Sequence, residues 1–495
     1  MRLAELLAQA GLPQEGAGEA VVTGFAIDHR KVAPGTVFGA FQGATVNGED
    51  FIRPAIAAGA IAVVARPEAR VEGALHIADV TPRRAFARLA AGFFSPYPAT
   101  IVAVTGTNGK TSTVEMTRQI WRMAGERAAS IGTLGVTTPD GSVSTGLTTP
   151  DIVTFLANMA GLAREGVTHV AYEASSHGLD QYRGEGPKVS ASAFTNFSRD
   201  HLDYHGTMEA YFAAKMRLFT EVVAPGSAAV IHDGGDGSEW TAKAIAQAEA
   251  RGLTVLTVGE GGAFLKLIAR EPGQLGQLLH VEHEGATRTV NLPLIGAYQA
   301  ANALVAAGLA LATGIPASGV FDALARLQPV RGRLERAALN AAGAPAYVDY
   351  AHTPDALEAA IAALRPHVAA GGRLIVVFGA GGDRDAGKRP EMGAVAARAA
   401  DLAIVTDDNP RSEDPAAIRA AILAGAGGNT REIEGRREAI AAAIGEAGAR
   451  DIVLIAGKGH EQGQIFGAGG QMRIEAFDDV EVARECAGGQ GRGMR

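Results

Sequence analysis

Short, uninterrupted apolar runs recur along the chain, and most are followed by a polar, glycine-rich cluster and then by an amphipathic segment. From about residue 99 to 330, four runs predict strands at 101–106, 168–175, 191–197 and 226–233. From about 331 to 487, a second series predicts strands at 345–352, 373–382, 401–410 and 451–461. Apolar strands that alternate with helices are typical of parallel sheets covered on both faces.

The first 96 residues have shorter apolar runs, at 21–30, 35–43 and 61–67. Segment 55–65 predicts a helix, a glycine stop and a buried strand. Ser95–Pro98 holds two prolines in four residues, which favours a linker. We therefore expect an α/β protein of three domains: a small N-terminal α/β domain at 1–96, a central parallel-sheet domain at 97–330 and a Rossmann-like α/β domain at 331–495. The glycine-rich tail, 487–495, is expected to be disordered.

Composition narrows the function classes. The 495 residues are 47% hydrophobic and 20% charged, which suits several packed cores and excludes a fibrous or disordered chain. The net charge of −8 disfavours broad binding to nucleic acid or anionic membranes. The single cysteine, Cys486, excludes an intramolecular disulfide and a cysteine-rich metal site. With neither a signal peptide nor a long apolar run, the expected location is the cytoplasm, without membrane insertion.

The strongest motif lies directly after the strand at 101–106. It comprises Thr105, Gly106, Thr107, Asn108, Gly109, Lys110, Thr111 and Ser112, and it opens an amphipathic helix. Backbone N–H groups of such a loop cradle phosphate oxygens, a lysine neutralises the β- and γ-phosphates, and a hydroxyl such as that of Thr111 binds Mg²⁺. The loop is a compact variant of the general pattern, because Val104 stands where the first glycine is usual. The alternative is a glycine-rich turn with an exposed lysine.

Further polar residues are candidates for the same site. Glu173 ends an apolar strand and suits Mg²⁺, which prefers hard oxygen ligands, although a capping or ion-paired glutamate is the alternative. His201, His205 and Lys215 follow in one segment. From the residues alone, both histidines are more typical of structural roles, and Lys215 of a helix surface.

Five motifs together resemble the Mur ligase family and its relative folylpolyglutamate synthetase. They are TGTNGKTS at 105–112, DYAHTPDALE at 349–358, GAGGDRDAGKRP at 379–390, TDDNPRSEDP at 406–415 and GKGHE at 457–461, in the order that the family has. The resemblance runs from about Thr23 to Asp479. It is closest to the members that join meso-2,6-diaminopimelate to UDP-N-acetylmuramoyl-L-alanyl-D-glutamate during peptidoglycan precursor synthesis.

The resemblance implies an ATP-dependent, amide-forming ligase that works through an acyl phosphate and uses ATP and Mg²⁺. It assigns catalysis to Lys110, Lys215 and Arg333, and ATP contacts to the loop 105–112, Asn302 and Arg333. It implies a metal site of Thr111, Glu173, His205 and Lys215, the last in carbamylated form, and leaves His201 structural. Two departures stand out: Tyr298-Gln299 replaces the usual Phe-Asn, and residues 231–237 differ from the family pattern.

The same resemblance implies where the nucleotide-sugar substrate binds. The uridine end matches Ile27, His29 and the turn Ala44, Thr45, Val46 and Asn47, although the family usually has serine at His29. The muramoyl-peptide portion matches Thr148, Thr149, Ser175, Gln181 and Arg183. Taken singly, each of these could equally be an ordinary turn residue.

The incoming amino acid is expected to meet the C-terminal zone. The matching residues are Arg384, Asp408, Asn409, Pro410, Arg411, Gly457 and Glu461. Arg411 can hold a second carboxylate in a bidentate contact, and diaminopimelate has that carboxylate whereas lysine does not. A lysine-adding ligase on the same scaffold is the alternative, and a nucleotide-dependent switch without ligase activity is the alternative from another class. The partners are thus small-molecule substrates, with no nucleic acid, and the chain is expected to be a monomer.

Overall fold

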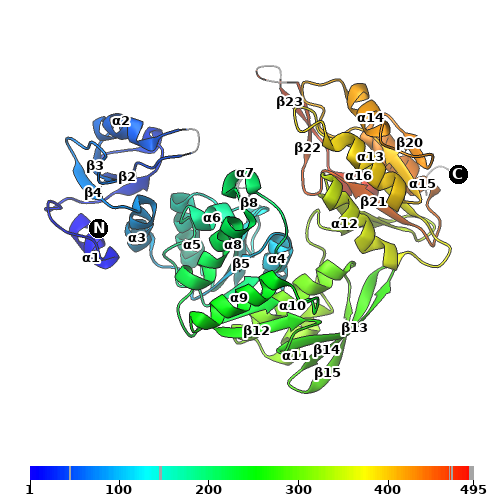
Figure 1. The fold of residues 1–495 in the computed structure, drawn as a ribbon, viewed down its shortest axis with the longest axis horizontal. Helices are drawn as coiled ribbons and strands as arrows, with labels where there is room; N and C mark the ends of the chain where they lie inside the picture. Colours follow the sequence, from blue (N-terminus) through cyan, green and yellow to red (C-terminus); the bar gives the residue numbers. More distant parts are fainter. Residues whose placement is uncertain (44–45, 144–147, 468, 470–471, 490–495) are drawn as a thin grey trace. The chain divides into compact units, whose positions relative to one another are not determined.

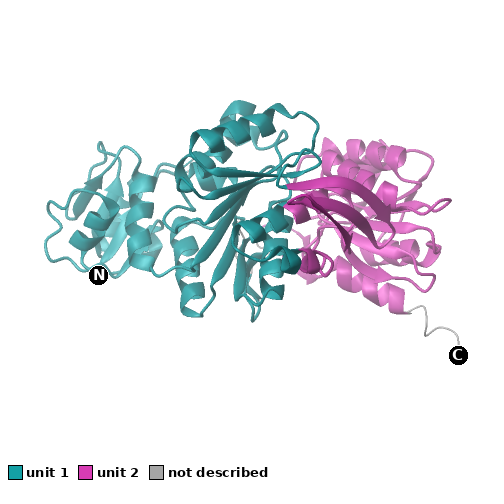
Figure 2. Ribbon diagram, turned by 90° about the horizontal axis from the view of Figure 1, so that it is seen from below, with its two compact units in different colours: residues 1–264, 305–320 teal, residues 265–304, 321–495 magenta. Residues whose placement is uncertain are grey.

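The computed structural model describes residues 1–43, 46–143, 148–467, 469 and 472–489 (Figure 1). Ala44 and Thr45 of the predicted uridine turn therefore lie outside the described residues. By its internal contacts the chain forms two compact units (Figure 2): unit 1 holds residues 1–264 and 305–320, and unit 2 holds residues 265–304 and 321–495. No helix within the described ranges is long and apolar enough to span a membrane.

Unit 1 begins with a small parallel sheet in the order β1-β2-β3-β4. Its strands are β1 (Gly24–Ala26), β2 (Thr36–Gly39), β3 (Ala60–Ala65) and β4 (Leu75–Ala78), accompanied by α1 (Leu3–Ala10), η1 (His29–Lys31), η2 (Gly48–Phe51), α2 (Ile52–Ala57) and α3 (Pro82–Phe94). The predicted sequence of helix, glycine and strand is confirmed. Gly59 has a φ of 109° and its backbone approaches Pro34, so only glycine fits between α2 and β3.

The larger sheet of unit 1 has the strand order β12-β11-β10-β5-β9-β6-β7-β8. Neighbours are parallel from β12 to β6, as predicted, and antiparallel from β6 to β8. The strands are β5 (Thr100–Thr105), β6 (Ala128–Gly132), β7 (Gly135–Thr137), β8 (Ser142–Val143), β9 (His169–Glu173), β10 (Ala191–Phe194), β11 (Ala228–His232) and β12 (Thr254–Gly259). The helices are α4 (Lys110–Met123), α5 (Ile152–Arg164), α6 (Ser176–Asp180), α7 (Leu202–His205), α8 (Met208–Arg217), the π-helix η3 (Leu218–Val222) and α9 (Glu239–Ala250).

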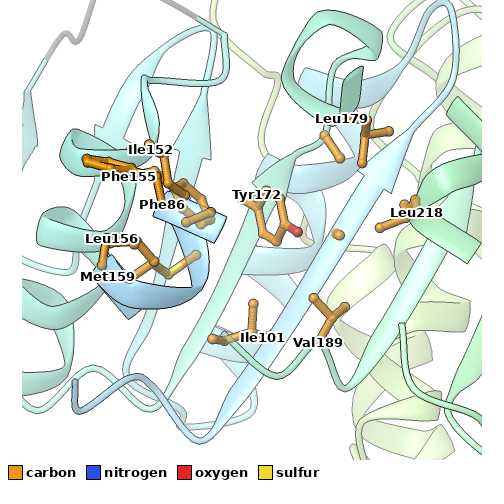
Figure 3. Packing of buried hydrophobic residues seen from close by; sticks show 14 of the residues in the cluster. Phe86, Ile101, Ile152, Phe155, Leu156, Met159, Tyr172, Leu179, Val189 and Leu218 are labelled. Atoms are coloured by element: carbon orange, nitrogen blue, oxygen red, sulfur yellow. The ribbon is translucent and has the colours of Figure 1, made fainter. Parts of the chain in front are cut away.

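One apolar core connects the two sheets of unit 1. Phe86 of α3 packs beside Ile152 and Phe155 of α5, while Ile101 and Tyr172 lie on the adjacent strands β5 and β9 (Figure 3). All five side chains are at least nine-tenths buried. Because α3 belongs to this core, its N-terminal end is held at a fixed place beside the central sheet.

Unit 2 opens with an antiparallel sheet that the sequence interpretation did not predict. β13 (Leu265–Gly273), β14 (Gly276–His283) and β15 (Ala286–Leu292) form two consecutive hairpins, where a parallel strand–helix pattern was expected. Much of this sheet is polar and exposed, so its strands lack the continuous apolar run that marks a buried parallel strand. The helices α10 (Ala297–Ala312) and α11 (Ala317–Leu324) follow in the chain and are divided between the units, because residues 305–320 belong to unit 1.

The rest of unit 2 is a doubly wound sheet in the order β16-β17-β21-β18-β19-β20, with all neighbours parallel except β16 and β17. Its strands are β16 (Glu335–Leu339), β17 (Pro345–Asp349), β18 (Leu374–Phe378), β19 (Leu402–Val405), β20 (Thr430–Glu432) and β21 (Ile452–Ala456). The helices are α12 (Pro354–Leu364), η4 (Arg365–His367), α13 (Lys388–Ala399), α14 (Pro415–Leu423), α15 (Arg436–Glu446) and α16 (Asp479–Gly489). A separate hairpin is formed by β22 (Gly463–Phe466) and β23 (Arg473–Ala476). The expectation of a disordered tail from residue 487 is wrong for 487–489, because α16 continues to Gly489.

Candidate active site

The loop between β5 and α4 is held in shape by the end of β10. Gly106 and Gly109 have φ of 143° and 85°, and a Cβ on Gly106 would lie 2.0 Å from Thr195 Oγ1. Asn196 clamps Asn108 from both sides: its Oδ1 accepts from Asn108 N at 2.9 Å, and its Nδ2 donates to Asn108 O at 3.1 Å. The glycines therefore serve a backbone shape that brings amide groups and the N-terminus of α4 together, as phosphate binding requires.

Sheet register places Glu173 beside this loop. In the pairing of β5 with β9, Val104 is opposite Glu173, so the carboxylate ends its strand where the loop starts. Glu173 is buried, and its Oε1 accepts from Thr133 N at 2.7 Å. A Cβ on Gly132 would meet Glu173 Oε1 at 2.1 Å, so a glycine is needed to accommodate the carboxylate.

Two lysines converge on the same backbone carbonyl. Lys110 Nζ donates to Gly106 O at 3.0 Å and to Thr107 O at 2.7 Å, and Lys215 Nζ donates to Gly106 O at 2.7 Å. Lys215 is 1% exposed, so the surface position expected from the residues alone is wrong. Burial, together with the nearby Lys110 charge, lowers the pKa of Lys215 to about 6. Its amine is therefore predominantly neutral at pH 7, which is the form that reacts with electrophiles.

The His205 ring presents a nitrogen atom that suits a bound cation. Its Nε2 is buried and has no hydrogen-bond partner among the residues that the structure describes, and burial lowers the pKa of the ring. The ring lies 5.2 Å from that of Tyr211, whose hydroxyl lies 3.3 Å from Thr107 Oγ1 of the loop. In the described ranges, His, Cys, Asp and Glu form no group of three or more that could hold a metal unaided. Mg²⁺ needs no such group, because it usually keeps several waters and binds through one or two side chains and substrate phosphates. Binding of Mg²⁺ by Thr111, Glu173 and His205 stays a prediction.

The residues expected to hold the muramoyl peptide form one hydrogen-bonded cluster in unit 1. Thr149 Oγ1 lies 2.9 Å from Ser175 Oγ and donates to Glu173 O at 2.8 Å. Arg183 donates to Thr149 O at 3.1 Å and, through Nε and NH2, to Gln181 Oε1. Thr148 Oγ1 lies 3.0 Å from Thr133 Oγ1, beside the Glu173 carboxylate. The predicted peptide site and the predicted metal site thus share neighbours.

Beside the N-terminal sheet, the described residues that are predicted to bind uridine are accessible to solvent. Ile27 and Val46 are exposed, and the ring of His29 stacks on Phe51 with centroids 4.5 Å apart and planes 7° from parallel. A flat aromatic pair at an accessible position provides a surface on which a planar base can stack.

The residues predicted to bind the incoming amino acid meet at the carboxyl ends of β18, β19 and β21 in unit 2. Asn409 Nδ2 donates to Glu461 Oε2 at 2.9 Å, and a Cβ on Gly457 would lie 2.6 Å from Asp408 Oδ2. Arg411 NH1 donates to Gly382 O at 2.7 Å. A Cβ on Gly381 would lie 2.7 Å from Arg411 NH1 and 3.9 Å from Arg384 Cγ, so both arginines border the same glycine turn. Pro410 directly precedes Arg411 in the chain. Ligands of doubly wound sheets bind at such strand ends.

Comparison with known proteins identifies the family. Three family models match: "Mur ligase family, catalytic domain" at 21–94, "Mur ligase middle domain" at 104–310 and "Mur ligase, glutamate ligase domain" at 332–459. A relative from Zymomonas mobilis, named UDP-N-acetylmuramoyl-L-alanyl-D-glutamate--2,6-diaminopimelate ligase, is 60% identical over 94% of both chains. The chain belongs to the Mur ligase family.

Other relatives agree with this assignment. A protein of the same name from Bradyrhizobium diazoefficiens is 53% identical over 97% of this chain and 98% of its own. A solved structure with that name has a TM-score of 0.72 at 33% identity, covering 95% of this chain and 96% of the other. The predicted three-domain α/β architecture of the Mur ligases is therefore confirmed, whereas the boundaries at 96/97 and 330/331 stay predictions.

In this Mur ligase, Asn302 and Arg333 belong to unit 2, whereas the phosphate loop belongs to unit 1. Gln299, at the departure from the family's usual residue, donates through Nε2 to Arg333 O at 2.8 Å, and Asn302 Nδ2 lies 3.4 Å from Gln299 Oε1. The Arg333 guanidinium lies 5.2 Å from the centroid of the Tyr350 ring. The expected contacts of Asn302 with adenine and of Arg333 with phosphate stay predictions.

Sequence reasoning missed several residues of these Mur ligase sites. Thr195, Asn196 and Tyr211 shape the phosphate loop, and Lys458 lies fully buried between Asn409 and Glu461, with Nζ 2.9 Å from Asn409 Oδ1. Lys458 lies inside the GKGHE motif, so the sequence did offer a reason to name it as a site residue. The other three gave no signal, because their proximity to the loop comes from strand pairing and helix packing.

Proposed function

We propose that this chain is an ATP-dependent ligase that adds meso-2,6-diaminopimelate to UDP-N-acetylmuramoyl-L-alanyl-D-glutamate, in cytoplasmic peptidoglycan precursor synthesis. The observation that carries the proposal is the pair of lysines at Gly106 O within a loop built for phosphate. The names of the relatives, at 60% and 53% identity over nearly full length, support the choice of substrates.

In the first step, the D-glutamate side-chain carboxylate attacks the γ-phosphorus of ATP, which gives an acyl phosphate and releases ADP. The loop amides and Lys110 stabilise the charge that develops on the phosphoryl oxygens. The cluster of Thr149, Ser175 and Arg183 lies next to Glu173 and suits the oxygens of the peptide portion. Holding the carboxylate near the phosphate removes the entropic cost of their encounter.

In the second step, the amine of diaminopimelate attacks the acyl phosphate through a tetrahedral intermediate, and phosphate leaves as the amide forms. Glu461 and Asp408 provide carboxylates for an ammonium group, and Arg411 provides a guanidinium for the distal carboxylate. The reaction requires no nucleophilic serine, cysteine or histidine.

Mg²⁺ at Thr111, Glu173 and His205 would supply additional charge stabilisation at the phosphates. Lys215, whose Nζ lies at Gly106 O of the loop, would take part once it is carbamylated, because addition of CO₂ with loss of a proton converts a neutral amine into an anionic oxygen donor. Its burial and its lowered pKa favour that modification. Intact-mass and peptide measurements should detect a labile CO₂ adduct on Lys215.

The test is a complete reaction with ATP, Mg²⁺, UDP-N-acetylmuramoyl-L-alanyl-D-glutamate and diaminopimelate. The expected products are ADP, phosphate and a tripeptide product of the corresponding mass, and removal of Mg²⁺ with a chelator should stop their formation. ATP binding without amide product would instead support the nucleotide-dependent switch.

A further inference from the structure

Two consecutive arginines in the first turn of α3 have different surroundings. Arg84 lies 3.5 Å from both Glu185 Oε1 and Glu221 Oε2, so its charge is compensated. Arg83 forms no ion pair with any carboxylate in the described part of the chain. Its NH2 donates to Gln42 O at 3.0 Å, and its guanidinium lies 4.9 Å from the centroid of the Phe41 ring.

The start of α3 lies against the segment that carries Arg183. The Arg84 guanidinium is 5.9 Å from the centroid of the Tyr182 ring and is paired with Glu185, so α3 contacts the residues on both sides of Arg183. Arg183 likewise has no carboxylate partner among the described residues, and it donates to Thr149 O and Gln181 Oε1.

The two guanidinium groups lie within each other's electric field. Burial and, next in size, the charge of Arg183 lower the pKa of Arg83, and burial lowers the pKa of Arg183. Asp180 has an opposing influence on Arg83, but its Oδ2 accepts from the Tyr204 hydroxyl at 2.7 Å. Two half-buried like charges, one of them at the positive N-terminal end of α3, destabilise the fold unless an anion compensates them. The first turn of α3 contains no acidic residue.

The position of Arg83 indicates which anion compensates the charges of the two arginines. Its contacts with Phe41 and Gln42 lie at the start of the predicted uridine turn, and Arg183 belongs to the cluster predicted to hold the muramoyl peptide. We infer that Arg83 and Arg183 together bind an oxyanion of the nucleotide-sugar substrate, either a phosphate of its diphosphate or a carboxylate of its peptide. This inference rests on the proposed function, and it adds Arg83 to the binding residues.

The experiment compares Arg83→Met with Arg84→Met. Methionine keeps an apolar stem at Phe41 but removes the charge, and Arg84 is the adjacent arginine with its own carboxylates. Calorimetric titration of the full-length protein with UDP-N-acetylmuramoyl-L-alanyl-D-glutamate should show Kd raised about tenfold or more in Arg83→Met. Arg84→Met should stay within about threefold of the unaltered protein and should lower the unfolding temperature instead.

Titration with UDP separates the two sources of the oxyanion. Weaker binding of both ligands to Arg83→Met would assign Arg83 to the diphosphate, and weaker binding of the full substrate alone would assign it to the peptide carboxylate. Unchanged Kd for both ligands in a folded Arg83→Met, verified by circular dichroism, would overturn the inference and leave the proposed function intact. Failure of the unaltered protein to bind the nucleotide-sugar would overturn both.

Discussion

At the scale of single residues, Lys110 is the side chain on which the proposed phosphate chemistry depends most directly. It spans the loop from the first residue of α4 back to the carbonyls of Gly106 and Thr107, so its charge is already oriented over the place where phosphates would bind. Removing one such preorganised group typically lowers kcat by about 100- to 1,000-fold.

We therefore expect Lys110→Ala to lower the rate of phosphate release by at least about 100-fold. The matched control is Lys243→Ala, which removes an exposed lysine ion-paired with Glu239 on α9 and should leave the rate unchanged. A steady-state assay of phosphate release measures both variants. Full activity in Lys110→Ala would remove the assignment of the phosphate loop.

Lys458 is expected to act as a positioning residue. Its Nζ donates to Asn409 Oδ1 and thereby fixes the amide so that Nδ2 faces Glu461. In Lys458→Met the amide loses one of the two donors to its Oδ1, the other being Ile465 N at 3.0 Å. We expect KM for diaminopimelate to rise about tenfold while KM for ATP stays within about twofold.

Initial-rate measurements with each substrate varied in turn test this split in the two KM values. Equal increases in both, accompanied by a lower unfolding temperature, would indicate a general packing role for Lys458 rather than control of the amino-acid site. Lys243→Met again provides the control for loss of a lysine.

At the same scale, the sequence predicted residue identity better than residue environment. Glu173, Arg411 and Glu461 were named from the sequence. The structure places Glu173 beside the loop 105–112 and Glu461 beside Asn409, while the roles of all three stay predictions. Burial of Lys215 was not predictable from the residues alone, because a lysine on a helix is usually exposed. Arg83 was missed as well, since its significance depends on Arg183, which is 100 positions away in the chain.

At the scale of elements, His367 connects three parts of unit 2. Its Nε2 accepts from Gly296 N, just before α10, and its Nδ1 donates to Gly273 O at the end of β13, while His367 itself ends η4. Protonation of Nε2 would set two N–H groups against each other. Burial accordingly lowers the pKa of His367.

The sign of the resulting pH dependence follows from linkage. The unfolded chain binds a proton near its ordinary pKa of about 6.5, whereas the folded ring resists it until a lower pH. Stability from this contact is therefore complete above about pH 6.5 and is lost as the pH falls below it. We expect the free energy of unfolding to decline from about pH 7 to pH 5, and to decline less in His367→Gln. Urea unfolding at both pH values measures the difference, and equal declines would contradict the assignment.

Strand prediction succeeded where burial makes a strand apolar on both faces and failed where it does not. The eight strands predicted in the two parallel sheets are all present, seven of them shorter than predicted and β5 of equal length but one residue earlier. The hairpins of β13 to β15 were missed because the prediction relied on continuous apolar runs, which these strands lack. Their residues are largely polar, and even an apolar side chain such as that of Ile268 is exposed. Short strands such as β7 and β20 carry too few residues for a periodicity to be recognised.

At the scale of the whole molecule, each predicted zone contributes a distinct group of site residues. The N-terminal sheet carries the residues predicted to bind uridine, and the larger sheet of unit 1 carries the predicted phosphate loop. The strand ends of unit 2 carry the residues predicted to bind the incoming amino acid. A ligase that joins two substrates at the expense of ATP needs all of these groups, whereas a nucleotide-dependent switch needs only the loop.

Specificity for the acceptor is the property that tests this assembly most completely. The Arg411 backbone has a φ of 52°, and both its N–H and its guanidinium are bonded, to Ile465 O and Gly382 O respectively. The side chain is thus held in place, and under the proposed function it meets the distal carboxylate of diaminopimelate, which a lysine substrate would not supply.

The decisive measurement is phosphate release with ATP, Mg²⁺ and UDP-N-acetylmuramoyl-L-alanyl-D-glutamate, with meso-diaminopimelate or L-lysine added in parallel. We predict release with diaminopimelate only, accompanied by a tripeptide product of matching mass. Release with lysine would retain the ligase but contradict the role of Arg411. Release with neither acceptor would contradict the proposed function itself.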